Sequence, residues 1–221
     1  MAIISSLAPE LILSILGWVA PDDLFNASIV CRQFWSIATP LINEHRSLQS
    51  QYSTITPGKD NNDHTLWDIL SLVLKNPRIA YYIRHVNIPA ERNVFYDPTI
   101  WMTDQAQPHH LRPPHEQIEL FTSVISDSYL AADESALIRA AIEIGSDGPI
   151  IALLLPLLPN LKNFSFVDWG EEEFLLRALR RIAIAHSTAK PPLAFWHLTQ
   201  VSLSHWDTEC GIHWEFVRYL V

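Results

Sequence analysis

Three segments of the chain share one apolar spacing, and this repeat constrains the fold more than any other feature of the sequence. Each segment is six residues long and has apolar residues at its first, fourth and sixth positions. The segments are Ile83-Arg84-His85-Val86-Asn87-Ile88, Leu161-Lys162-Asn163-Phe164-Ser165-Phe166 and Leu198-Thr199-Gln200-Val201-Ser202-Leu203. The last two apolar positions alternate as in a strand, and the first lies where the chain enters that strand. The sequence therefore predicts three short strands that belong to one repeated unit.

Helical patterns fill the intervals between these strands. Apolar residues recur at helical spacing over residues 116–130, 133–144 and 171–186, and residues 149–158 form a short apolar segment. A parallel strand requires a crossover connection, and a helix supplies it. We therefore predict that Val86–Ile88, Phe164–Phe166 and Val201–Leu203 lie as parallel strands in one sheet, with helices on its convex side. Such units stack into a curved solenoid in which each unit contacts only its neighbours.

The spacing of the three segments is uneven. Leu198 follows Leu161 by 198 − 161 = 37 positions, whereas Leu161 follows Ile83 by 161 − 83 = 78 positions. Because 78 is about twice 37, we expect one degenerate or overgrown repeat in the wider interval. That interval also contains the Pro-rich stretch Pro89–Pro114, whose aromatic residues either fold back onto the repeats or contact a partner. Folding back is the favoured alternative, because exposed aromatic clusters are rare in monomers.

The N-terminal segment has the pattern of three short helices. Pro9 suits a first helical position, Pro21 ends the first helix, and Asp22 begins a brief second one at 22–26. One apolar stripe of the first helix comprises Leu11, Ile12, Ile15, Leu16 and Val19. The third helix, over residues 28–45, carries two neighbouring apolar stripes, one through Phe34 and one through Trp35. Because one small helical partner cannot cover both stripes, we expect another surface to pack there.

Composition excludes several classes of function. The formal net charge of −9 over 221 residues disfavours nucleic-acid binding, and the longest apolar stretches are too short to span a bilayer. Cys31 and Cys210 are the only cysteines, which suits a reducing compartment and predicts a cytoplasmic or nuclear protein. His205, Cys210 and His213 are close in sequence, but their spacing matches no usual zinc pattern. Since no phosphate loop or nucleophile motif occurs either, we expect no cofactor, no metal and no enzymatic activity.

The N-terminal motif resembles an F-box. Leu7-Ala8-Pro9-Glu10-Leu11-Ile12 is similar to its opening, and Asp23-Leu24 followed by Val30-Cys31-Arg32-Gln33-Phe34-Trp35 matches its second half. The ending Ala38-Thr39-Pro40-Leu41-Ile42 is similar to fungal members in particular. The resemblance covers roughly residues 5–45, and Ala8 stands where the family usually has Pro.

This resemblance implies a module that docks on a Skp-type adaptor, which in turn links it to a cullin scaffold. The downstream domain of such a protein selects the target for ubiquitination. By matching motif positions, the candidate adaptor-binding residues are Leu7, Pro9, Leu11, Ile12, Ile15, Leu24, Val30, Cys31 and Trp35. For Leu16, Phe34 and Leu41 a place in the internal core is the better interpretation. Cys31 is better interpreted as a small buried apolar side chain. Trp35 is equally consistent with a place in the core and a place in the interface.

The resulting fold class is mainly α with α/β repeats: a three-helix F-box followed by an irregular leucine-rich-repeat-like solenoid. The predicted boundaries are a helical module at 1–48, a polar linker at 49–63 and a substrate-binding repeat domain at 64–221. Because the last predicted repeat has no capping unit after it, we expect the chain to be a fragment of a longer protein. The leading function is substrate receptor of a ubiquitin ligase for an unidentified target. The alternative is a non-catalytic repeat scaffold whose N-terminal helices act only as a cap.

Overall fold

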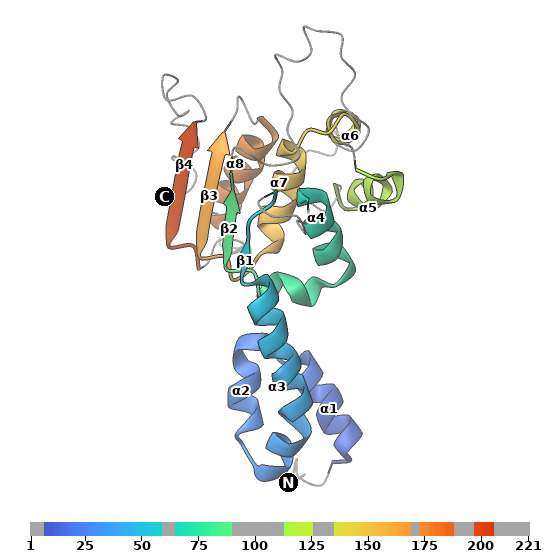
Figure 1. The fold of residues 1–221 in the computed structure, drawn as a ribbon, viewed down its shortest axis with the longest axis vertical. Coiled ribbons are helices and arrows are strands. Elements are labelled where there is room, and N and C mark those ends of the chain that lie inside the picture. Colours follow the sequence, from blue (N-terminus) through green and yellow to red (C-terminus); the bar gives the residue numbers. More distant parts are fainter. Residues whose placement is uncertain are drawn as a thin grey trace, which may run out of the picture. The chain divides into compact units, whose positions relative to one another are not determined.

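The computed structural model of the chain describes residues 7–58, 65–89, 113–125, 135–168, 173–187 and 197–205. The chain divides into two compact units, Met1–Ser53 and Thr54–Val221 (Figure 1). Each unit has its own set of buried apolar side chains. Residues 90–112 of the Pro-rich stretch, residues 126–134 at the ends of two predicted helices, and residues 206–221 lie outside the described residues.

Three helices form the N-terminal unit: α1 (Pro9–Trp18), α2 (Pro21–Ser28) and α3 (Arg32–Tyr52). Pro9 and Pro21 occupy the first positions of α1 and α2, where the missing N–H of proline costs no helical hydrogen bond. Acidic side chains follow in both first turns and complement the helix dipoles. The predicted set of three N-terminal helices is therefore confirmed.

The core of this unit is a small cluster contributed by all three helices. Its buried members are Ile12, Leu16, Leu24, Phe34, Ala38 and Ile42, and half-buried side chains that pack against them are Leu7, Val19, Ala27, Cys31, Ile37 and Leu41. Complete burial of one such aliphatic side chain stabilises a fold by about 1.5–3 kcal/mol. Leu16 and Phe34, predicted as core, are confirmed as core.

The second unit contains a four-stranded parallel sheet in the order β1-β2-β3-β4. Its strands are β1 (Thr54–Ile55), β2 (His85–Ile88), β3 (Asn163–Asp168) and β4 (Gln200–His205). Val86 pairs with Phe164, which pairs with Val201 on its other side. The prediction that the three repeated segments lie parallel in one sheet is therefore confirmed.

Backbone hydrogen bonds repeat at the entry to successive strands. The carbonyl of Arg84 accepts the N–H groups of Lys162 and Asn163, with N···O distances of 2.8 and 3.1 Å. The carbonyl of Lys162 accepts those of Thr199 and Gln200, again at 2.8 and 3.1 Å. This repeated geometry shows that the two segments enter the sheet in the same way.

Helices lie along one side of the sheet. They are α4 (Leu66–Lys75), α5 (His115–Ile125), α6 (Ser135–Glu143), α7 (Gly148–Leu154) and α8 (Glu173–Ser187), with the 3-10 helices η2 (Pro77–Tyr81) and η6 (Leu155–Leu157). Figure 1 shows α8, α7 and α4 as a row beside the strands, and α7 contacts both of the others. Every residue of α7 is buried, because helices and sheet enclose it.

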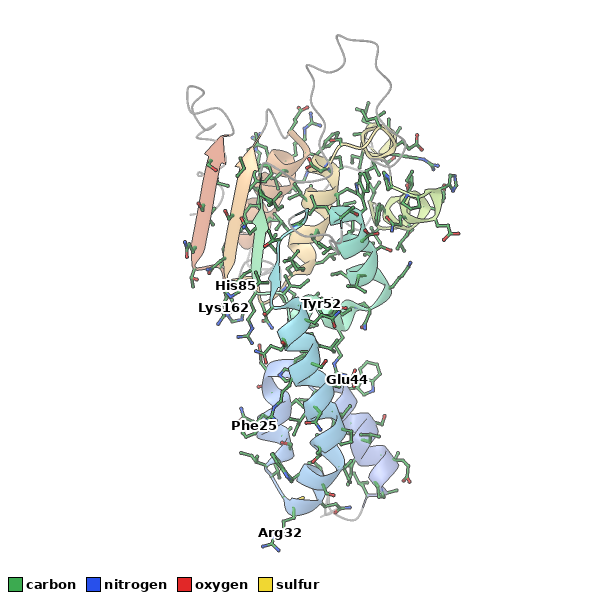
Figure 2. All side chains as sticks on the ribbon, viewed as in Figure 1. Phe25, Arg32, Glu44, Tyr52, His85 and Lys162 are labelled. Atoms are coloured by element: carbon green, nitrogen blue, oxygen red, sulfur yellow. The ribbon has the colours of Figure 1, made fainter. Side chains whose placement is uncertain are left out.

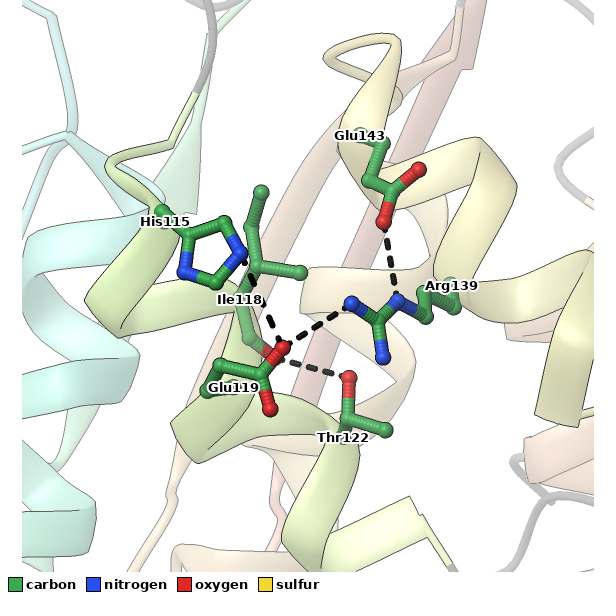
Figure 3. Close-up of polar contacts among 6 residues, drawn as sticks. All are labelled: His115, Ile118, Glu119, Thr122, Arg139 and Glu143. Atoms are coloured by element: carbon green, nitrogen blue, oxygen red, sulfur yellow. Dashed lines mark hydrogen bonds and ion pairs between the residues drawn. The ribbon is translucent and has the colours of Figure 1, made fainter.

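An ion pair connects α5 to α6 at the surface, and a second one lies within α6 (Figure 3). The Arg139 guanidinium donates from Nη2 to Glu119 at 2.9 Å and from Nε to Glu143 at 2.8 Å. The hydrogen bond to Glu143 and the charge of Glu119 raise the pKa of Arg139 above its ordinary value. On the other side of α5, Gln117 donates to Asp68 of α4 at 3.0 Å. Polar contacts therefore join α4, α5 and α6 in sequence.

One expectation needs correction, and another is narrowed. Residues 49–55, predicted as part of a linker, continue α3 to Tyr52 and then form β1, which pairs with β2. Among the described residues between Ile83 and Leu161, no strand separates β2 from β3, which pair directly. The described part of that interval forms α5, α6 and α7, which favours the overgrown repeat over the degenerate one.

Candidate functional site

One side of α1 exposes a row of large apolar side chains. Leu11, Ile15 and Trp18 are 55%, 48% and 89% exposed, and they stand at positions i, i+4 and i+7 of the helix. Ile12 and Leu16, one position further along in each turn, are buried in the core. The apolar surface of α1 is therefore two adjacent stripes, one buried and one exposed, which we call the α1 outer stripe (Leu11, Ile15 and Trp18).

A second exposed apolar group spans α2 and the start of α3. Its members, which we call the α2–α3 patch, are Phe25, Ile29, Val30 and Trp35. The rings of Phe25 and Trp35 meet edge to face, with centroids 6.1 Å apart and an interplanar angle of 87°. Figure 2 shows Phe25 pointing outward from α2. Nearby, the buried Ser28 hydroxyl donates to the Phe25 carbonyl at 2.6 Å, which fixes the end of α2.

The structure separates the predicted adaptor-binding residues into three groups. Pro9, Leu11, Ile15, Val30 and Trp35 are exposed on the N-terminal unit. Leu7 and Cys31 are half-buried and pack against its core. The third group, Ile12 and Leu24, is completely buried.

Ile12 and Leu24 must be removed from the candidate surface. Both side chains are completely buried in the core of the three helices. A side chain with no exposed surface cannot contact a partner unless the unit opens. The motif positions of these two residues are therefore explained by packing between α1, α2 and α3, and not by contact with an adaptor.

Four exposed residues were missed by the sequence interpretation. They are Leu13, Trp18, Phe25 and Ile29. A signal for Trp18 was present, because it continues the spacing of Leu11 and Ile15 by one more turn. Phe25 and Ile29 lacked such a signal, because neither belongs to an apolar stripe of the sequence, and Ile29 follows the end of α2 and lies outside the helix predicted for it.

Exposed charged groups stand at the start of each helix that carries the exposed apolar side chains. Glu10 lies in the first turn of α1, and Asp22 and Asp23 lie in the first turn of α2, all exposed. Arg32 begins α3 and projects from the end of the unit in Figure 2. An apolar centre with a charged rim is the general arrangement of a protein–protein interface.

The described residues give little support to a metal site or to a membrane-spanning segment. Among them, no group of three or more His, Cys, Asp or Glu side chains could hold a metal ion. Cys210 and His213 of the possible metal set lie outside the described residues. No described helix is by itself long and apolar enough to cross a membrane. Only α6 together with Gly148–Leu157 meets that length and composition, and the pair is bent by 117°.

Comparison with known proteins gives one match. Residues 4–39 match the family model described as the F-box domain. No curated protein and no solved structure matches the chain. The matched residues run from the N-terminal end through α1 and α2 and into α3, which carry the α1 outer stripe and the α2–α3 patch. The N-terminal unit of this chain therefore contains an F-box domain.

Proposed function

We propose that the chain is the substrate-recognition subunit of an SCF-type cullin ubiquitin ligase. The F-box domain binds a Skp-type adaptor, and the adaptor connects the chain to a cullin scaffold. The protein acts by binding and not by catalysis, as is typical of F-box proteins. Its place of action is the cytoplasm or the nucleus.

The observation that carries this proposal is the exposed apolar surface within the matched F-box. Trp18 is 89% exposed and Val30 is 73% exposed, although both are large apolar side chains. Burial of such a side chain in an interface contributes about 1.5–3 kcal/mol, against the entropic cost of association. Large apolar and aromatic side chains of this kind are the usual anchors of helix-mediated interfaces.

The second unit is the candidate target-binding domain. We propose that it is an irregular leucine-rich-repeat-like array, whose repeated element is a strand followed by a helical connection. Support comes from the register of Val86, Phe164 and Val201 and from the repeated hydrogen bonds to the Arg84 and Lys162 carbonyls. The helical insertion between β2 and β3 makes the array irregular.

Co-purification tests the proposed function. The full chain is co-expressed with a fungal Skp-type adaptor and analysed by size exclusion with light scattering. A one-to-one complex is expected, and addition of the cullin N-terminal domain is expected to extend it to a ternary complex. An F-box protein of established adaptor binding serves as the control for adaptor activity. A folded chain that elutes alone, while this control forms its complex, would contradict the proposal and favour a free-standing scaffold.

A further inference from the structure

The sheet has an apolar face and a polar face. Alternation along β2 and β3 buries Val86, Ile88, Phe164 and Phe166. The intervening side chains are exposed or half-buried and form what we call the open sheet face. They are Thr54, His85, Asn87, Asn163, Ser165, Val167, Gln200, Ser202 and Ser204. None of these residues is acidic, in a chain whose formal net charge is −9.

Positive charge lies at the N-terminal end of this face. Lys162, immediately before β3, is exposed, and Figure 2 shows Lys162 and His85 at the same end of the sheet. Within the described part of the chain, Lys162 makes no ion pair. On the helices, by contrast, Arg139 pairs with Glu119 and Glu143, and Arg177 pairs with Glu173. Arg139 and Arg177 are thus neutralised, whereas Lys162, at the end of the sheet where β3 begins, is available to an external anion.

The uncharged side chains of the face are suited to an extended peptide. His85, Asn163 and Gln200 stand in one row across three strands, and Asn163 Nδ2 donates to Gln200 Oε1 at 3.4 Å. Asn87, Ser165 and Ser202 form the next row. Amide and hydroxyl groups both donate and accept hydrogen bonds, so these rows offer partners to peptide groups and to carboxylate oxygens. A carboxylate or phosphate on the peptide would complement Lys162, since charge-assisted hydrogen bonds are the stronger kind.

We propose that the open sheet face binds an acidic, extended segment of the protein selected for ubiquitination, with an anionic side chain at Lys162. This inference deepens the proposed function and depends on it for the identity of the partner as a ligase target. The absence of acidic side chains on the face makes a basic segment a poor fit, because such a segment would leave its charges unpaired.

Fluorescence anisotropy with defined peptides tests the proposal on the full chain. The probes are short fluorescein-labelled peptides of alternating Glu and Ser, of alternating Gln and Ser, and of Gln and phosphoserine. Both anionic peptides are expected to bind more tightly than the neutral one, and added salt should weaken their binding. Comparison of the two anionic peptides shows whether carboxylate or phosphate is the preferred anion.

Charge-reversal variants locate the site. Lys162→Glu is expected to weaken anionic peptide binding by about tenfold or more, which corresponds to about 1.4 kcal/mol. Lys75→Glu, at an exposed position of α4, is the matched control and should change the affinity less than about twofold. Ser202→Glu on the open sheet face, with Ser123→Glu on α5 as its control, gives a second pair. Circular dichroism confirms that each variant is folded.

Several results would overturn the inference: equal binding of the neutral peptide, equal loss in a variant and its control, or no binding of either anionic peptide. These outcomes do not affect the adaptor co-purification, because the proposed adaptor-binding surface lies in the N-terminal unit. Loss of adaptor binding with retained peptide binding would instead contradict the ligase function and leave the acidic-peptide site in place.

Discussion

The carbonyl of Arg84 has the same role at the entry to β3 as the carbonyl of Lys162 has at the entry to β4. Each accepts two consecutive N–H groups from the next segment, at 2.8 and 3.1 Å. Because the entry geometry repeats, the strands pair in phase and their side chains form rows across the sheet. The rows alternate between an apolar face toward the helices and a polar face toward solvent. The same geometry thus produces both the core and the surface proposed for target binding.

The core of the F-box unit predicts a contrast between two substitutions. Leu24→Ala should destabilise the unit by about 2–5 kcal/mol, because it removes a fully buried side chain and leaves a cavity. Val30→Ala, at a position that is 73% exposed, should change the unfolding free energy by less than about 0.5 kcal/mol. Urea unfolding followed by circular dichroism measures both. Equal destabilisation would mean that Leu24 is not a core residue.

The start of α4 provides a second stability test. Thr65 Oγ1 accepts the Asp68 N–H at 3.2 Å, and Asp68 accepts the Thr65 N–H at 3.1 Å, which together make a capping box. Thr65→Ala should therefore cost about 0.5–2 kcal/mol in thermal or urea unfolding. Thr122→Ala is the matched control, since its hydroxyl bonds to Ile118 within α5, where alanine is the better helix former. A smaller effect at Thr65 than at Thr122 would contradict the capping role.

The repeat spacing in the sequence was sufficient to predict β2, β3 and β4 and their parallel arrangement, because apolar alternation directly reflects burial on one face. β1 was missed for a physical reason. Register pairs Ile55 with Val86, so Tyr52, Ile55 and Pro57 occupy the three apolar positions of the repeat. Tyr52 and Pro57 stand where the other repeats have Ile, Leu or Phe, so the apolar spacing was not recognised. Proline is tolerated at this position because β1 lies at the sheet edge.

Burial within the F-box unit was harder to predict from sequence. On α1, Leu11 and Ile12 are adjacent and equally apolar, yet one is 55% exposed and the other is fully buried. Periodicity identifies an apolar side of a helix but does not show how much of that side the neighbouring helices cover. Coverage depends on how α2 and α3 pack against α1, so the separation of core from surface required the structure.

Trp35 tests the contribution of the α2–α3 patch. Trp35→Ala should weaken adaptor binding by about tenfold, because interfacial tryptophan side chains are frequent anchors. The thermal unfolding temperature should change little, since Trp35 is exposed and touches Phe25 at the surface. Isothermal titration calorimetry with the adaptor gives the affinity, and Leu137→Ala on α6 is the control for loss of an exposed apolar group. Unchanged affinity would remove Trp35 from the interface.

Calorimetric titration of the adaptor into a charge-substituted α1 outer stripe tests the central claim most directly. Leu11→Asp combined with Ile15→Asp would place two carboxylates in the proposed interface, where burial of an unpaired charge is strongly unfavourable. The matched control is Leu137→Asp combined with Ile184→Asp, at positions of the second unit that are 64% and 55% exposed. We predict that the α1 variant stays folded and loses detectable binding, while the control binds as the wild type does. A folded α1 variant with wild-type affinity would contradict the assignment of α1 as the adaptor-binding surface.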